Sequence, residues 1–342
     1  MAKTVQGRGV VGMQPSMRQD VAFVAGAETL AKIESFLDEA LTDATEVIYL
    51  LGCGGSNYMF GVMEYLLREA KIPVVSMNAA EFTAKVPAPT GSKACVIASS
   101  THGTTRETAE AIKVAGSTGS SVALVTQVED SLCGREAQHV LLHNGVEAKQ
   151  VLLALVAKEI LARTGASHDQ IPSSSEFNKV AEVFESSNSE WAQTFEDFAK
   201  TIVNGDATIV IGAGPNIGAA STFAACYLME MQNIPAVPVE ANDFLHGTHE
   251  LVGAEFPVLL LATEDDTKIL NDRVKSFLSR FTDKAMVLDT SDLAMPGVAE
   301  EHRATMGAVL MSSSIIARLA QKIEAETQVP LITRKYMWKV EY

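Results

Sequence analysis

The sequence predicts an α/β protein of two tandem doubly wound domains, each a parallel sheet between two helical layers in a three-layer α/β/α architecture. Its 342 residues suit two domains, because one domain usually takes about 100–200 residues. The apolar share of 47% is enough for two cores. Short apolar runs alternate with longer helical patterns, which is typical of parallel sheets covered by helices.

An internal repeat is the third observation. Residues 65–82 (YLLREAKIPVVSMNAAEF) and 227–244 (YLMEMQNIPAVPVEANDF) share Tyr-Leu, then Ile-Pro, then an acid before Phe, all offset by 162 residues. Each copy follows an apolar run that ends in glycines, at 47–57 and 207–217. We expect strand, glycine turn, helix and strand in each copy. A repeat of this long period indicates duplicated domains.

The remaining elements follow from apolar runs of strand or helix length. In the first half we expect strands at 93–100, 120–127 and 138–144, and helices at 105–119 and 147–164. In the second half we expect strands at 256–263 and 284–290, and helices at 269–281 and 306–326.

These elements divide the chain. An N-terminal helix and the first domain should occupy 1–165, a linker rich in Ser, Asn and Glu 166–190, and the second domain 191–342. The last residues form an aromatic tail with Tyr336 and Trp338, which we expect to pack against another surface.

Charge and composition exclude several classes of function. A net charge of −15 argues against nucleic acid as a partner, since phosphate backbones need a basic face. No apolar run reaches the about 18 residues of a membrane helix, and the N-terminus lacks an apolar signal core. The four cysteines form no CxxC pair, so neither a metal nor a redox cofactor is predicted. A cytoplasmic protein is expected.

Two segments of the first domain are suited to binding an anion. Residues 52–56 (GCGGS) lie at a strand-to-helix turn, where glycines let the backbone approach a ligand and the helix supplies free N–H groups. Residues 99–108 (SSTHGTTRET) place several hydroxyls around one glycine between a strand and a helix. Hydroxyls and N–H groups of this kind can surround a phosphate without a metal.

Other interpretations of these turns remain open. The second could be an ordinary helix start with a capping box from Thr104 to Glu107. Neither glycine turn has the G-x-G-x-x-G spacing of a dinucleotide site, so a nicotinamide enzyme is a weak alternative.

The motifs together resemble the sugar isomerase (SIS) domain family. They are CGGS, SSTHGTTRET, MEMQ at 229–232, F-x-HG at 244–247 and the final YMWKVEY. The resemblance extends from about residue 20 to the end. It includes the isomerase half of glucosamine-6-phosphate synthase, and it is greater to bacterial deglycases of phosphorylated Amadori compounds.

The resemblance implies a phosphate site in the first domain. It would be formed by Gly54, Ser56, Ser100, His102 and Thr105. A histidine stands at 102 where the synthase has Ser, and a protonated imidazole there would add positive charge.

The resemblance also implies a catalytic set. Glu230 falls on the proton-transfer glutamate, His246 on the ring-opening histidine sixteen residues later, and Lys339 on the C-terminal lysine. His249 competes with His246 for its role. The repeat places Arg68 where the second copy has Glu230, so the fold itself does not require an acid there.

The expected activity is that of a deglycase, which releases an amine or amino acid from a phosphorylated ketosamine. An isomerase or aminosugar deaminase on the same scaffold is the alternative, and a non-catalytic sugar-phosphate sensor is a third. The family resemblance implies a homodimer with shared sites. The sequence departs from the family at Asn242, Asp243 and Thr248, which puts the exact substrate in doubt.

Overall fold

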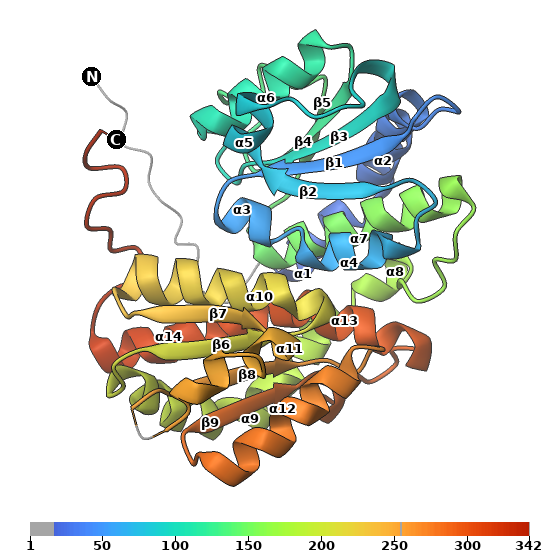
Figure 1. Ribbon diagram of the computed structural model, residues 1–342. Helices are drawn as coiled ribbons and strands as arrows, with labels where there is room; N and C mark the ends of the chain where they lie inside the picture. The colour runs from blue at the N-terminus through green and yellow to red at the C-terminus, as the bar shows by residue number, and fades with distance from the viewer. Residues whose placement is uncertain (1–16, 254, 342) are drawn as a thin grey trace.

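The computed structural model describes residues 17–253 and 255–341, and it contains two parallel sheets (Figure 1). The first sheet has the order β2-β1-β3-β4-β5. Its strands are β1 (Val47–Gly52), β2 (Val74–Asn78), β3 (Ala94–Ser99), β4 (Ser121–Thr126) and β5 (His139–Leu142).

The second sheet has the order β7-β6-β8-β9. Its strands are β6 (Thr208–Gly212), β7 (Ala236–Glu240), β8 (Val258–Ala262) and β9 (Ala285–Asp289). The β1–β2 pair occupies the same place in its sheet as β6–β7 does in the other. This agrees with the repeat and confirms the fold class predicted from the sequence.

Helices cover both faces of each sheet. Those of the first domain are α1 (Met17–Val24), α2 (Ala27–Ala40), α3 (Gly55–Tyr58), α4 (Gly61–Leu66), α5 (Ala79–Ala84), α6 (Arg106–Ser117) and α7 (Gly145–Thr164). Those that follow are α8 (Ser174–Phe177), α9 (Val180–Val203), α10 (Ile217–Thr222), α11 (Ala241–Phe244), α12 (Lys268–Phe281), α13 (Arg303–Leu310) and α14 (Ile316–Thr327).

Alternating strand residues explain the three layers. Ile48 and Leu50 of β1 face one apolar cluster, and Tyr49 and Leu51 face another. Since successive side chains of a strand point to opposite faces, β1 is buried on both. The same alternation holds for β6 of the second sheet, where Ile209 packs in an apolar cluster on one face and the alternate residues point to the other face.

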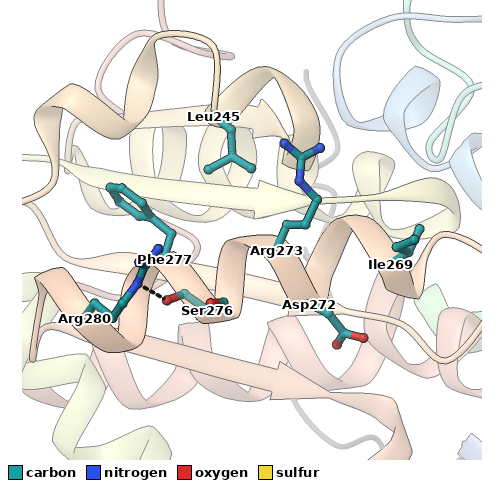
Figure 2. A pocket seen from close by; sticks show the side chains of 7 residues that line it. All are labelled: Leu245, Ile269, Asp272, Arg273, Ser276, Phe277 and Arg280. Atoms are coloured by element: carbon teal, nitrogen blue, oxygen red, sulfur yellow. Dashed lines mark hydrogen bonds between the residues drawn. The ribbon is translucent and has the colours of Figure 1, made fainter.

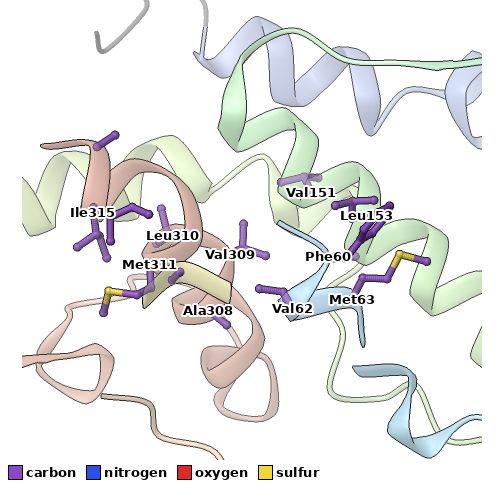
Figure 3. Packing of buried hydrophobic residues seen from close by; sticks show 14 of the residues in the cluster. Phe60, Val62, Met63, Val151, Leu153, Ala308, Val309, Leu310, Met311 and Ile315 are labelled. Atoms are coloured by element: carbon purple, nitrogen blue, oxygen red, sulfur yellow. The ribbon is translucent and has the colours of Figure 1, made fainter. Parts of the chain in front are cut away.

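One apolar cluster extends from the first sheet to the second. Figure 3 shows Phe60, Val62 and Met63 of the first domain packing near Val309 and Leu310 of α13. The two domains therefore share a buried layer, with α7 among its most buried elements.

A glycine pair lets the two domains pack closely. A Cβ on Gly218 of α10 would lie 2.2 Å from the carbonyl oxygen of Tyr58, and one on Gly61 would lie 2.9 Å from the Cα of Gly218. Backbone packs on backbone here, so only glycine fits. The contact holds the glycine turn after β1 against the helix that carries Glu230.

Two segments differ from expectation. Residues 166–190, predicted as a linker, include α8 and the first part of α9, because Phe177, Val180 and Val183 are buried in the shared core. The closing helix predicted at 306–326 is interrupted by a π-helical turn, Met311–Ile315. No helix among the described residues is both long and apolar enough to cross a membrane.

Candidate active site

The two predicted anion-binding turns lie side by side. β1 and β3 are neighbouring parallel strands, and their register pairs Gly52 with Ser99. The turns that follow both strands therefore meet at one edge of the sheet. β2 lies on one side of β1 and β3 on the other, so the strand order reverses at β1. Doubly wound sheets bind ligands at the carboxyl ends of the strands where this reversal occurs.

The first turn depends on a glycine at residue 54. Gly54 has φ +52° and forms the N-cap of α3, a conformation that side chains rarely adopt. Ser56 lies in the first turn of that short helix and is partly exposed.

The second turn leaves its helix start open. α6 begins at Arg106 with Thr105 as N-cap, and no side chain in the described chain caps it. The hydroxyls of Ser100 and Thr105 instead lie 3.0 Å apart. The alternative of a capping box from Thr104 to Glu107 is therefore wrong, and the N–H groups of this helix end are available to a ligand.

His102 does not supply the charge considered from the sequence. Desolvation lowers its pKa below the ordinary 6.5, so the imidazole is neutral at pH 7. Its ring lies edge-on to Trp338 of the C-terminal tail, with centroids 6.5 Å apart. His102 thus connects the phosphate turn to the tail.

Glu230 lies in a π-helical segment, Phe223–Gln232. Such segments are rare and occur frequently at functional sites. Burial raises the pKa of the Glu230 carboxyl, and the Arg334 guanidinium opposes this shift. Arg334 Nη2 lies 2.8 Å from Glu230 Oε1, and the two side chains are only 6% and 26% exposed.

The tail joins these two parts into one site. The Arg334 guanidinium lies 5.2 Å from the centroid of the Trp338 ring, whose other neighbour is His102. On the other side, a Cβ on Gly55 would lie 2.9 Å from the sulfur of Cys226, one helical turn before Glu230. The phosphate turns and Glu230 therefore line one region between the domains.

Lys339 does not contact Glu230 directly. Its side chain is exposed, and its Nζ donates a hydrogen bond to the backbone carbonyl of Arg334. Lys339 thus lies near the site and supports the turn that presents Arg334.

His246 lies away from Glu230 of its own chain. Glu230 precedes β7 and His246 follows it, so the two lie at opposite ends of a strand of 5 residues. Such a strand is about 16 Å long. The exposed His246 imidazole has no hydrogen bond or ion pair in the described parts of the chain.

His249 has a structural position instead. Its Nδ1 lies 3.2 Å from the carbonyl oxygen of Phe244, and its ring packs edge-on to Phe244 and Phe277. These contacts favour His246 over His249 as the residue free to act on a ligand.

A surface depression beside this loop is shown in Figure 2. It lies between Leu245 and one face of α12, and Arg280 there donates to the carbonyl oxygen of Ser276 at 2.9 Å. It contains none of the predicted site residues.

Two residues of this region were not predicted from the sequence. Arg334 is one, and nothing in its local pattern pairs it with Glu230. Lys149 is the other: it is 1% exposed in α7, near Cys226 and His143. A signal for it was present, since it is a charged residue at the start of the apolar run 151–157.

Comparison with known proteins identifies the first domain. Residues 40–163 match the family model described as the SIS domain. This segment is a SIS domain. The resemblance expected from the glycine turn and the Ser/Thr turn, which both lie in this SIS domain, is therefore confirmed.

Curated relatives extend the similarity to most of the chain. The fructosamine deglycase of Bacillus subtilis (strain 168) is 27% identical over 329 residues, covering 93% of this chain and 99% of the relative. The fructoselysine 6-phosphate deglycase of Escherichia coli (strain K12) is 20% identical over 266 residues, covering 77% of this chain and 78% of that one.

A solved structure shows the same fold. The crystal structure of a candidate phosphosugar isomerase from Bacillus subtilis matches with a TM-score of 0.85 at 26% identity. The match covers 93% of this chain and 100% of that chain.

Proposed function

We propose that this SIS-domain enzyme cleaves a 6-phosphorylated ketosamine into a hexose 6-phosphate and a free amine or amino acid. The observation that carries the proposal is Glu230, a half-buried carboxylate paired with Arg334 in the same region as two phosphate-type turns. The names of the deglycase relatives support the substrate class.

The reaction needs a proton to move between adjacent carbons. In the open-chain ketosamine, Glu230 removes a proton from C1 and returns one to C2. The nitrogen loses its proton and the C2 oxygen gains one, so the 2-ketone and amine become a 2-hydroxyl and an imine at C1. Water then adds to the imine, and the carbon–nitrogen bond breaks to give an aldehyde and an amine. One carboxylate on one face of the substrate suits both proton transfers.

The surroundings of Glu230 suit a base near neutral pH. Burial raises its pKa towards the working range, and Arg334 limits the rise so that the carboxylate stays ionised. The guanidinium also fixes the carboxylate direction through a charge-assisted hydrogen bond.

The position of His246 supports a shared site in a homodimer. Because His246 lies at the other end of β7 from Glu230, we assign ring opening to His246 of a second copy. The tail favours a partner surface as well, because its aromatic side chains Tyr336 and Trp338 are 59% and 68% exposed. Lys339, held against the backbone of Arg334, positions this tail.

A product assay tests the proposal. The purified protein is incubated with a panel of 6-phosphorylated Amadori compounds, glucose 6-phosphate is measured enzymatically and free amino acid by mass spectrometry. We expect both products in equal amounts from at least one adduct. Interconversion of plain hexose phosphates or release of ammonia from an aminosugar phosphate, with no adduct cleaved, would contradict the deglycase assignment.

A further inference from the structure

Lys149 is a buried cation without a counter-ion in the described structure. It is 1% exposed, and its Nζ has no hydrogen-bond partner among the residues that the structure describes. A buried ammonium is normally paired, since leaving water costs several kcal/mol. Burial accordingly lowers the pKa of Lys149 to about 7.

The groups facing Lys149 do not neutralise it. Its electrostatic neighbours are Cys226, from the π-helical segment, and His143, from the end of β5. Burial raises the Cys226 pKa to about 12, so the thiol is protonated. Burial lowers the His143 pKa to about 3, so the imidazole is neutral, with Nδ1 bonded to the Gly145 carbonyl oxygen at 3.0 Å.

These neighbours link Lys149 to both phosphate turns. The backbone of Gly55 lies within hydrogen-bonding reach of the Cys226 sulfur. His143 in turn interacts electrostatically with His102 of the second turn. The buried ammonium thus interacts electrostatically with Cys226, which lies against the first turn, and with His143, which interacts with the second.

The basic residue of the two turns is Arg106, the first residue of α6, and its side chain is exposed. Ser56, Ser100 and Thr105 offer hydroxyls, the helix ends offer N–H groups, and His102 is neutral at pH 7. A sugar phosphate is a dianion near pH 7 and must leave water in an acidic protein of net charge −15. A buried cation from a third segment would add positive charge on the inner side of the turns, away from the exposed Arg106.

We propose that Lys149 binds the phosphate group of the substrate and supplies the positive charge of the phosphate site. The inference rests on the proposed function, since it takes a phosphosugar as the ligand. When the dianion binds, it stabilises the protonated ammonium, so binding is coupled to uptake of a proton by Lys149.

The test is calorimetric binding of fructose 6-phosphate, with inorganic phosphate as a second probe. Titrations at about pH 8 in buffers of different ionisation enthalpy give the number of protons taken up. The wild-type protein is compared with Lys149→Met. Lys158→Met is the matched control, because Lys158 lies on the same helix and bonds the carbonyl oxygen of Ile171 instead.

Lys149→Met should bind fructose 6-phosphate on the order of 10- to 100-fold more weakly and lose the proton uptake, with Lys158→Met unchanged. Equal affinity and equal proton uptake in Lys149→Met and wild type would overturn the role of Lys149. Binding of fructose 6-phosphate to the wild type without proton uptake would also overturn it, and this measurement does not depend on the folding of a variant. A wild-type protein that binds no sugar phosphate would instead remove the proposed function itself.

Discussion

Arg334 donates a hydrogen bond to Glu230 across 2.8 Å, and the guanidinium is only 6% exposed. The contact joins the C-terminal tail to the helix that precedes β7. It has two consequences: the tail is part of the site, and its arginine sets the protonation of the residue proposed as the base.

Replacing Arg334 with Met should move the acidic limb of the kcat/KM profile to higher pH. Arg334 lowers the pKa of Glu230 against the effect of burial, so its loss raises that pKa and reduces the ionised fraction at a given pH. A pH–rate profile measures the shift. Lys335→Met is the control, since Lys335 is exposed in the same turn, and an unshifted limb in Arg334→Met would contradict the pairing.

The contact between Gly55 and Cys226 predicts a rescue. A Cβ at Gly55 would lie 2.9 Å from the Cys226 sulfur, so Gly55→Ala should displace the phosphate turn and weaken sugar-phosphate binding about tenfold. Cys226→Ala in the same chain removes the clash and should restore part of the affinity.

The matched control for this pair is Gly116→Ala, because a Cβ at Gly116 would meet no atom within 4 Å. Isothermal titration with fructose 6-phosphate gives all four affinities. If the double variant binds as weakly as Gly55→Ala, the loss does not come from the sulfur contact.

Lys149→Met should stabilise the fold, most strongly in acid. The folded-state pKa of about 7 lies below the ordinary 10.5, so below pH 7 both states carry the proton and the native state bears the full cost of the buried charge. Between about pH 7 and pH 10.5 the unfolded state binds more protons than the native state, so the stability of the wild type rises with pH. The extra stability of Lys149→Met over the wild type therefore shrinks as the pH rises.

Denaturant unfolding of both proteins at about pH 6 and about pH 9 measures this difference. A stabilisation by Lys149→Met that is equal at both pH values would show that the ammonium is not buried and unpaired in the free protein.

A mixture of two inactive variants should recover activity if the site is shared between copies. Glu230→Gln and His246→Ala each disable every site of a homodimer. A mixed dimer has one site with both residues intact, so random mixing should restore about a quarter of wild-type activity. Absence of any recovery on mixing would place His246 outside the partner's site.

His249→Ala should lower the melting temperature instead, because that ring packs on Phe244 and Phe277.

The fold was predictable because its signals are local. Each strand of the sheets reads as an apolar run, and the 162-residue repeat shows that one unit occurs twice. The linker was less predictable: Phe177 and Val183 are buried by residues far away in the chain, which composition cannot show.

The site was predictable only in part. The spacing between Glu230 and His246 and the hydroxyls around Ser100 are visible in the sequence, but the state of each group depends on tertiary burial. The neutral His102 and the partner Arg334 follow from how the tail folds back onto the first domain. The apolar run after Lys149 hints at burial, but the loss of every partner for its ammonium among the described residues depends on how α7 packs on all sides.

The central claim is that Glu230 transfers the proton, and Glu230→Gln tests it most directly. The change keeps the size of the side chain and a hydrogen-bond acceptor for Arg334 but removes the base. Turnover of the best ketosamine phosphate is measured together with circular dichroism and fructose 6-phosphate binding. We predict an intact fold, binding within a few-fold of wild type, and a kcat lower by about 10²- to 10⁴-fold. A folded Glu230→Gln protein that turns over substrate at the wild-type rate would contradict the account.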